Sequence, residues 1–116
     1  MAAQIGLSTI TATIAAGQSL SSAVYLGASF LAGIFIPSNW TSANLTFQGS
    51  PDGGTTWGEL YTYLGAEWTF VAAASQFLTV DPTQWKGVRS LIVRSGTAAS
   101  AVNQTNTVNL TLTLSL

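Results

Sequence analysis

The sequence predicts an all-β protein: an antiparallel β-sandwich, jelly-roll-like, with at most one short helical turn. Apolar and polar residues alternate with a period of two in several segments, which is the pattern of strands buried on one face. Turn residues such as Gly, Pro, Asn and Ser separate these segments at short intervals, as in β-sandwiches and jelly rolls. The chain has 116 residues, the length of one domain, which we expect to span 1–116.

The two terminal segments give the clearest alternation. The C-terminal segment places five apolar residues on one face: Val108, Leu110, Leu112, Leu114 and Leu116. The N-terminal segment does the same with Ile10, Ala12 and Ile14, opposite a face of Thr residues. Ile5 and Leu7 have the other parity. One extra residue reverses the faces of a strand, so this change predicts a bulge near Ser8.

Several strands are expected between the terminal ones. The apolar run 23–36 predicts two buried strands with a turn or kink near Gly27 or Gly33. Further strands are expected at 44–48, 57–63, 67–71, 76–80 and 88–94. The last of these is apolar on both faces around Ile92, which is typical of a central strand.

One short stretch favours a helical turn. Asp81 precedes Pro82, and this order suits an N-cap followed by the first helical position, where proline's missing N–H costs nothing. Gly87 then ends the turn. We expect a single turn that places Trp85 on the core.

A motif of the form S-x-D-x-G-x-T-W, known as the Asp-box, predicts a tight hairpin. Its residues are Ser50, Asp52, Gly54, Thr56 and Trp57. Asp52 would accept hydrogen bonds from the turn backbone, glycine would supply a positive φ, and the Trp would pack beneath the hairpin. A functional alternative is a calcium ion held by Asp52 and loop carbonyls, which would need six to eight oxygen ligands. We favour the structural role and expect no cofactor.

The composition excludes several classes of function. Charged residues make up 6% of the chain, against roughly 25% in an average domain. There is no His and no Cys, which excludes thiol chemistry, disulfides and His- or Cys-based metal sites. Three basic residues cannot neutralise a nucleic-acid backbone. The run 23–36 is shorter than the ~20 residues that span a bilayer, and Met1 to Gln4 form no basic n-region. We therefore expect no nucleic-acid partner, no membrane partner, no transmembrane segment and no signal peptide.

The carboxylates give little support for catalysis. Asp52 and Asp81 already have turn and cap roles, which leaves Glu59 and Glu67 as possible cross-strand neighbours. A glycosidase needs two carboxylates that face one cleft, but no His or Cys is present to share the chemistry, so we expect the protein not to be an enzyme. The basic residues Lys86, Arg89 and Arg94 are expected to pair with Asp81 or Glu67, or to serve an interface.

Aromatic residues suggest a second class of function. The candidate ligand or interface residues are Trp40, Tyr61 and Tyr63, placed on exposed loops or strands. Exposed aromatic rings can stack on sugar rings, so a carbohydrate-binding module is an alternative, although such rings also anchor cores and protein interfaces.

The shortage of charge bears on assembly. The outer faces of isolated sandwiches usually carry Lys and Glu, which discourage association. One interpretation is that Ser and Thr hydrate this surface sufficiently. The other is that much of the surface is covered in a permanent assembly.

Residues 36–96 carry an order of features that is similar to a known group of proteins. These features are Pro37-Ser38-Asn39-Trp40, Ser50-Pro51-Asp52-Gly53, Trp57-Gly58-Glu59-Leu60-Tyr61, Val80-Asp81-Pro82 and the run from Gly87 to Gly96. They resemble the small β-sandwich virion proteins of tailed bacteriophages, of the capsid decoration (cement) or head-fibre type. The resemblance covers about half of the chain, and the run 23–36 falls outside it.

The resemblance implies a role and partners. It implies a virion structural protein on the capsid exterior that stabilises the head by contacts with the major capsid protein. It also implies a homo-oligomer, a homotrimer above all, because decoration proteins commonly occupy threefold positions. A host-adhesion module that binds surface glycans is the alternative, and no catalytic motif is carried over.

Overall fold

The computed structural model describes residues 7–116, which form eight strands and one 3-10 turn. In chain order they are β1 (Leu7–Ile14), β2 (Val24–Tyr25), β3 (Phe30–Phe35), β4 (Leu45–Ser50), β5 (Gly58–Glu59), β6 (Phe77–Thr79), the turn η1 (Pro82–Trp85), β7 (Ser90–Ser95) and β8 (Val108–Ser115).

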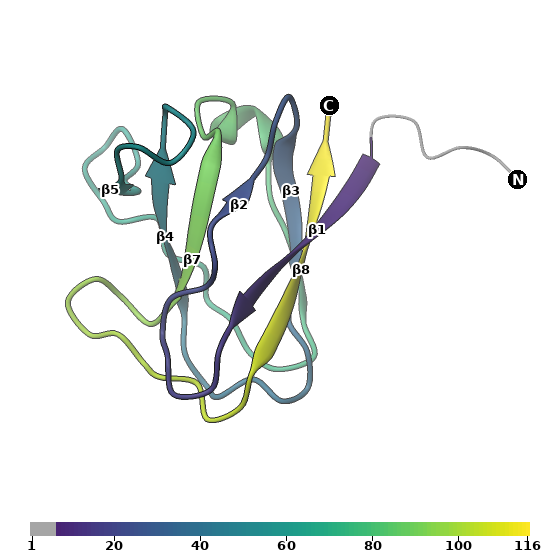
Figure 1. Cartoon of the computed structure of the whole chain (residues 1–116), viewed down its shortest axis with the longest axis vertical. Helices are drawn as coiled ribbons and strands as arrows, with labels where there is room; N and C mark the ends of the chain where they lie inside the picture. The colour runs from purple at the N-terminus through teal and green to yellow at the C-terminus, as the bar shows by residue number, and fades with distance from the viewer. Residues whose placement is uncertain (1–6) are drawn as a thin grey trace, which may run out of the picture.

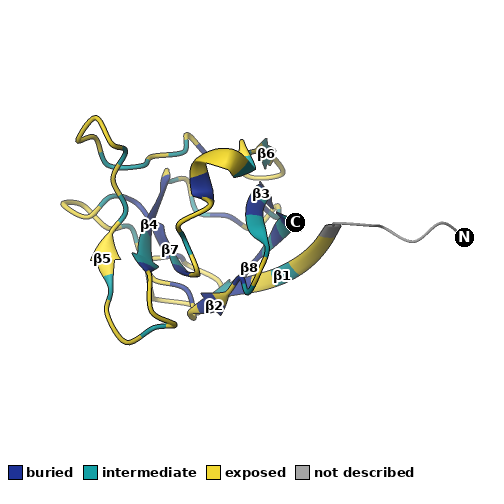
Figure 2. Cartoon of the chain, turned by 90° about the horizontal axis from the view of Figure 1, so that it is seen from above, coloured by how far each residue is buried: buried dark blue, intermediate teal, exposed yellow. Residues whose placement is uncertain are grey.

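The strands pair as one long hairpin folded over on itself. β1 pairs with β8, β2 with β7, β3 with β6 and β4 with β5, all antiparallel. Two further pairings, β3 with β8 and β4 with β7, join these four strand pairs into two sheets. Their orders are β1-β8-β3-β6 and β2-β7-β4-β5. Figure 1 labels all of these strands except β6, which is labelled in Figure 2. This arrangement is a jelly roll, so the predicted fold class is confirmed.

The core lies between the two sheets, where the buried segments gather in Figure 2. On β8 the residues Val108, Leu110, Leu112 and Leu114 are buried, and the residues between them are not. The predicted alternation is therefore confirmed, except that Leu116 follows the strand and is exposed. At the other sheet the Trp85 ring packs against the rings of Phe47, Trp68 and Phe70, with centroids 5.2–5.8 Å apart.

The apolar run 23–36 forms the two predicted strands, β2 and β3. Gly27 lies between them at φ 64°, in the left-handed region that glycine adopts without strain. The register of β3 against β8 also shifts between Leu31 and Gly33. The turn and the irregularity thus occur at both glycines that the sequence singled out.

The helical turn is confirmed in its details. Asp81 accepts a hydrogen bond from the Thr83 backbone N–H at 3.1 Å and another from its hydroxyl at 2.7 Å. Pro82 is the first residue of η1, and Lys86 is its C-cap, so the turn ends before Gly87. The side chain of Trp85 is 1% exposed and belongs to the core.

Three expectations about strands are wrong. The segment 57–63 contributes only the two residues of β5, and 67–71 forms isolated bridges at Glu67 and Phe70 instead of a strand. The β1–β8 register is unbroken from Leu7 to Ile14, so no bulge occurs at Ser8 within the described residues. Ile5, on which that expectation rested, lies outside them.

A buried glutamine ties the loops together at the end of the sandwich where β8 begins. The Gln104 side chain is fully buried. Its amide donates to the Thr41 carbonyl at 2.9 Å and to the Ser95 hydroxyl at 2.7 Å, and its Oε1 accepts from the Thr41 N–H at 2.7 Å. Burying an amide costs little free energy when its polar atoms have hydrogen-bond partners, and these bonds hold the loops in place.

Candidate functional site

The outer side of sheet β1-β8-β3-β6 is a broad polar surface, which we call the threonine face. Because Ala12, Ile14 and the even-numbered residues of β8 point inward, the residues between them point outward. The threonine face consists of Thr9, Thr11, Thr13, Asn109, Thr111, Thr113, Ser115, Gly33, Phe35, Phe77 and Thr79. Across the described residues, the four strands of this sheet carry no Asp, Glu, Lys or Arg.

The threonine face is ordered in rows across the strands. One row runs from Thr11 through Thr111 and Phe35 to Phe77, each residue directly opposite the next. The two phenylalanine rings are 44% and 58% exposed and meet edge to face, with centroids 6.5 Å apart. The face therefore combines hydroxyl groups with an exposed aromatic pair, a mixture that protein interfaces favour.

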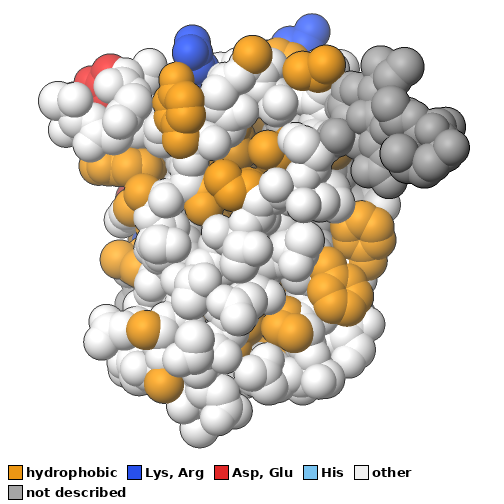
Figure 3. All heavy atoms as spheres, turned by 45° about the vertical axis from the view of Figure 1, so that its right-hand side comes forward, with side chains coloured by type: hydrophobic (Ala, Val, Ile, Leu, Met, Phe, Trp, Pro, Cys, Tyr) orange, Lys and Arg blue, Asp and Glu red, His pale blue; other side chains and the backbone are white. Residues whose placement is uncertain are grey.

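The charged residues lie mainly on other parts of the surface. Figure 3 views the molecule from the side of β1 and β8, and the Lys, Arg, Asp and Glu side chains visible there lie at the upper and left margins. All the charged residues fall between Asp52 and Arg94 in the sequence. One of them, Lys86, lies near the sheet, with its Nζ 6.0 Å from the centroid of the Phe30 ring.

The Asp-box residues form the tight loop between β4 and β5. The Ser50 hydroxyl donates to Asp52 Oδ1 at 2.8 Å and accepts from the Gly54 N–H at 2.8 Å. The Thr56 N–H donates to the same carboxylate oxygen at 2.9 Å, and Trp57 Nε1 donates to the Gly54 carbonyl at 3.0 Å. Gly54 itself has φ 100°. Each residue of the motif thus makes a hydrogen bond within the hairpin.

These bonds hold Asp52 in its charged form. The backbone N–H of Thr56, followed by the Ser50 hydroxyl, lowers the pKa of the Asp52 carboxyl below its ordinary value of 3.8. A carboxylate that accepts such bonds is favoured over its protonated form. Asp52 is therefore ionised at neutral pH.

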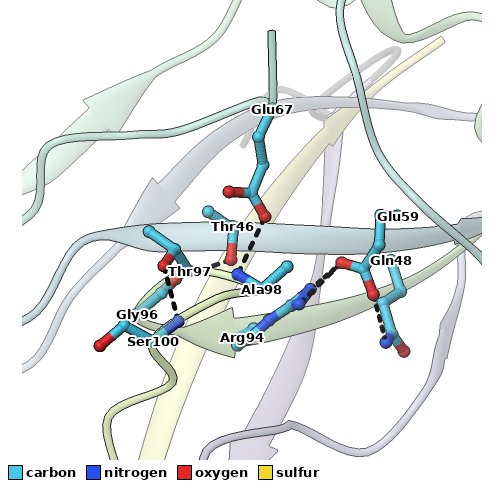
Figure 4. Close-up of polar contacts among 9 residues, drawn as sticks. All are labelled: Thr46, Gln48, Glu59, Glu67, Arg94, Gly96, Thr97, Ala98 and Ser100. Atoms are coloured by element: carbon cyan, nitrogen blue, oxygen red, sulfur yellow. Dashed lines mark hydrogen bonds and ion pairs between the residues drawn. The ribbon is translucent and has the colours of Figure 1, made fainter.

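A polar network crosses the other sheet, β2-β7-β4-β5. Arg94 lies on β7, and its side chain is 6% exposed. Both terminal nitrogens of its guanidinium donate to Glu59 Oε1, and Gln48 Nε2 donates to Glu59 Oε2 at 3.0 Å (Figure 4). The expectation that Arg94 pairs with Asp81 or Glu67 is wrong, because β5 brings Glu59 across β4 to it.

Glu59 and Glu67 have different hydrogen-bond partners. The residue opposite Glu67 is Tyr61, and Glu67 Oε2 accepts from the Ala98 N–H at 3.0 Å (Figure 4). The idea that the two carboxylates are direct cross-strand partners is therefore wrong. Glu59 closes an ion pair, whereas Glu67 anchors the loop that follows β7.

The three aromatic candidates do not share one surface. Trp40 is 7% exposed, and its Nε1 donates to the Ala43 carbonyl at 3.1 Å, so its placement on an exposed loop is wrong. Tyr61 and Tyr63 are 54% and 97% exposed. They line a groove of about 480 Å³ together with Thr62, Leu64, Trp68 and Gln84. Tyr63 lies in the turn after Tyr61 and not on a strand.

A further pocket was not anticipated from the sequence. It lies on the outer side of sheet β2-β7-β4-β5 and has a volume of about 370 Å³. We call it the serine pocket; its lining residues are Ala23, Val24, Tyr25, Gly53, Gly54, Trp57 and Ser90. The Asp-box motif singled out Gly54 and Trp57 of this lining. Tyr25 and Ser90 lie far apart in the sequence and meet through the β2–β7 pairing.

Residues 7–116 lack two other features that could carry a function. Groups of three or more His, Cys, Asp or Glu side chains that could hold a metal ion do not occur in this part of the chain. Within the same residues, no helix has the length and apolar character needed to cross a bilayer.

Comparison with known proteins adds a distant structural likeness. Neither the models of known protein families nor the curated proteins give a match to the chain. Among solved structures, it is similar to the Yersinia pseudotuberculosis-derived mitogen (YPM), with 17% sequence identity and a TM-score of 0.39. The match covers 95% of this chain and 85% of that one. A likeness at this level does not bear on what the chain binds.

Proposed function

We propose that the protein is a non-enzymatic structural protein of a bacteriophage virion, a capsid decoration (cement) protein. It lies on the capsid exterior and stabilises the head by contacts with the major capsid protein. The observation that carries this proposal is the threonine face, a sheet surface without charge that exposes Phe35 and Phe77. The resemblance of residues 36–96 to small β-sandwich virion proteins supports it.

An uncharged face suits permanent adhesion. Burying an ion costs free energy unless it is paired, and the strands of the threonine face carry no charged residue. Apolar burial would supply the attraction, at about 25 cal/mol per Å² before the costs of association are subtracted. Attachment should therefore depend little on salt, because there are few charges to screen.

The test adds one charge to the threonine face. Thr11→Lys changes an exposed residue on β1, beside Thr111 in the row that ends at the phenylalanine pair. Capsids prepared without the protein are mixed with each purified variant and pelleted, and the bound copies are counted. We expect Thr11→Lys to weaken attachment at least about tenfold, because the lysine would have to be desolvated.

The matched control is Ala66→Lys, which adds the same charge at an exposed loop outside the threonine face. It should bind like the unchanged protein. Capsids lacking the protein should also burst at a lower temperature. Equal binding of the two lysine variants, or absence of the protein from purified virions, would contradict the proposal.

The proposed assembly is a homotrimer, as the resemblance implies. The threonine face supports the general point that this surface is covered, either by the capsid or by another copy. Light scattering after size exclusion at micromolar concentration measures the mass. A clean monomer would contradict self-assembly in solution and leave assembly on the capsid as the next measurement.

A second candidate function is a host-adhesion module that binds surface glycans. The observation that favours it is the presence of exposed tyrosines beside hollows on the surface: Tyr61 and Tyr63 at one groove, and Tyr25 at the serine pocket. Virions lacking the protein would then keep their stability but adsorb less to host cells. The two functions are compatible, because the threonine face and the serine pocket lie on the outer sides of different sheets.

A further inference from the structure

Ser90 is a buried hydroxyl without a partner. The residue is 3% exposed, and among the described residues its Oγ has no hydrogen-bond partner. Its neighbour Leu91 points into the core, so Ser90 points to the outer side of sheet β2-β7-β4-β5. A buried hydroxyl that makes no hydrogen bond is costly, and its presence calls for an explanation such as a bound group.

Ser90 lies on the lining of the serine pocket. Across the sheet, Ser90 is directly opposite Tyr25 on β2 and Ser50 on β4, the first residue of the Asp-box. Gly53, Gly54 and Trp57 of the Asp-box loop line the same pocket. Tyr25 is 59% exposed. The lining of the pocket therefore combines two aromatic residues, Tyr25 and Trp57, with the unpartnered Ser90.

A second hollow adjoins the serine pocket and adds both signs of charge. It has a volume of about 240 Å³ and shares Tyr25 and Gly53 with the pocket. Its other lining residues are Pro51, Asp52 and Arg89. One carboxylate and one guanidinium provide an acceptor and a set of donors, and their charges balance.

This chemistry matches a neutral sugar. A hexose has an apolar C–H face that lies against aromatic rings, and hydroxyl groups that both donate and accept hydrogen bonds. Because the charges of Asp52 and Arg89 balance, the adjoining hollow favours neither an acidic nor a basic sugar. The Tyr61–Tyr63 groove offers ring faces too, but the only long polar side chain on its lining is Gln84. The serine pocket is the better site because it also holds the unpartnered hydroxyl.

We propose that the serine pocket binds a neutral hexose unit of a glycan, with Tyr25 stacked on the sugar's C–H face and Ser90 Oγ hydrogen-bonded to a ring hydroxyl. The adjoining hollow at Asp52 and Arg89 receives the next sugar unit. This inference rests on the second candidate function, glycan binding. It is independent of capsid attachment, which uses the threonine face.

The experiment is an NMR titration of the full chain with lactose, maltose, cellobiose and diacetylchitobiose, each tested separately. Saturable shifts are expected for the Trp57 indole N–H and the Ser90 amide with at least one of them. The expected Kd is on the order of 1–10 mM, as for a small ligand in an open site. Tyr25→Ala should weaken binding about tenfold. Tyr25→Phe, which keeps the ring, should change it less than about threefold.

Ser90→Ala separates binding from folding. Because the hydroxyl has no partner in the protein, its removal should not lower the Tm. The same change should weaken sugar binding about tenfold. The control is Tyr63→Ala, which removes an exposed tyrosine from the other groove and should leave the Trp57 shifts unchanged.

Several results would overturn the inference. One is the absence of saturable shifts with all four sugars at about 100 mM, well above the expected Kd. Another is loss of binding in Tyr63→Ala with Tyr25→Ala unaffected, which would place the sugar in the other groove and leave glycan binding itself intact. A fall in Tm for Ser90→Ala would show that the hydroxyl has a partner within the protein. None of these results bears on the capsid-binding comparison of Thr11→Lys with Ala66→Lys.

Discussion

The outer faces of the two sheets differ in how they are built. The threonine face repeats short hydroxyl side chains and contains no charge. The outer side of sheet β2-β7-β4-β5 carries the Glu59–Arg94 pair, the Asp-box loop and the serine pocket. A jelly roll has two such faces, and here one is uniform while the other holds individual contacts. On the proposed function, the first face makes broad contact with the capsid and the second presents specific groups to solvent.

The largest expected effect on stability comes from breaking the Glu59–Arg94 ion pair. Glu59→Ala would leave the Arg94 guanidinium, 6% exposed, without its carboxylate. Breaking a buried pair costs ~3–5 kcal/mol. We expect ~2–3 kcal/mol here, because the Glu59 side chain is 35% exposed and solvent screens the pair. Urea denaturation followed by Trp fluorescence measures the change.

Two variants sharpen this measurement. Glu67→Ala removes a single bond to the Ala98 N–H and should cost about 1 kcal/mol or less. Arg94→Met combined with Glu59→Ala removes the unpaired cation, so the double variant should be more stable than Glu59→Ala alone. Equal losses for Glu59→Ala and Glu67→Ala would mean that the ion pair contributes nothing beyond an ordinary surface contact.

The next effect concerns packing on the threonine face. A Cβ at Gly33 would lie 2.7 Å from Thr113 Oγ1, 2.8 Å from Phe77 Cε1 and 3.1 Å from the Leu78 carbonyl oxygen. Gly33→Ala should therefore destabilise the fold by ~1–3 kcal/mol, the usual cost of overpacking. Thermal unfolding by circular dichroism measures it. Gly58→Ala is the control, because a Cβ there meets no atom within 4 Å; an equal loss in both would refute close packing at Gly33.

The smallest effect concerns the Asp-box loop and pH. A carboxyl whose pKa is lowered by folding stabilises the fold above its unfolded pKa, and that contribution is lost as pH falls through the folded pKa. The Asp52 carboxyl should thus titrate below 3.8. Ser50→Ala should raise that pKa, because it removes a hydroxyl donor to the carboxylate.

NMR titration of the side-chain carboxyl carbons follows this change directly. Asp81 serves as an internal control, because its pKa is lowered by the Thr83 hydroxyl and N–H, and Ser50→Ala leaves these in place. An Asp52 midpoint that does not move in Ser50→Ala would contradict the role of the serine. A parallel shift of Asp81 would point to a general loss of structure instead.

The sequence by itself determined the short-range features of this protein. Alternation identified the inward faces of β1 and β8, because side chains of a strand point to opposite sides in turn. The Asp-box hairpin and the cap at Asp81 followed from residues two to four positions apart, whose hydrogen bonds need no distant partner. The absence of charge from the terminal segments was also visible at once.

Only the tertiary structure decided which distant residues meet. Alternation shows that a face is buried or exposed, but it does not identify the strand that lies beside it. The pairing of β7 with both β2 and β4 brings Ser90 next to Tyr25, and brings Glu59 on β5 within reach of Arg94. Trp40 resembled an exposed loop residue until packing placed its ring in the core. Each of these outcomes depends on contacts between residues that are distant in the sequence. The free energy of such contacts depends on the neighbours that the fold supplies, and not on the local preference of a residue for a strand.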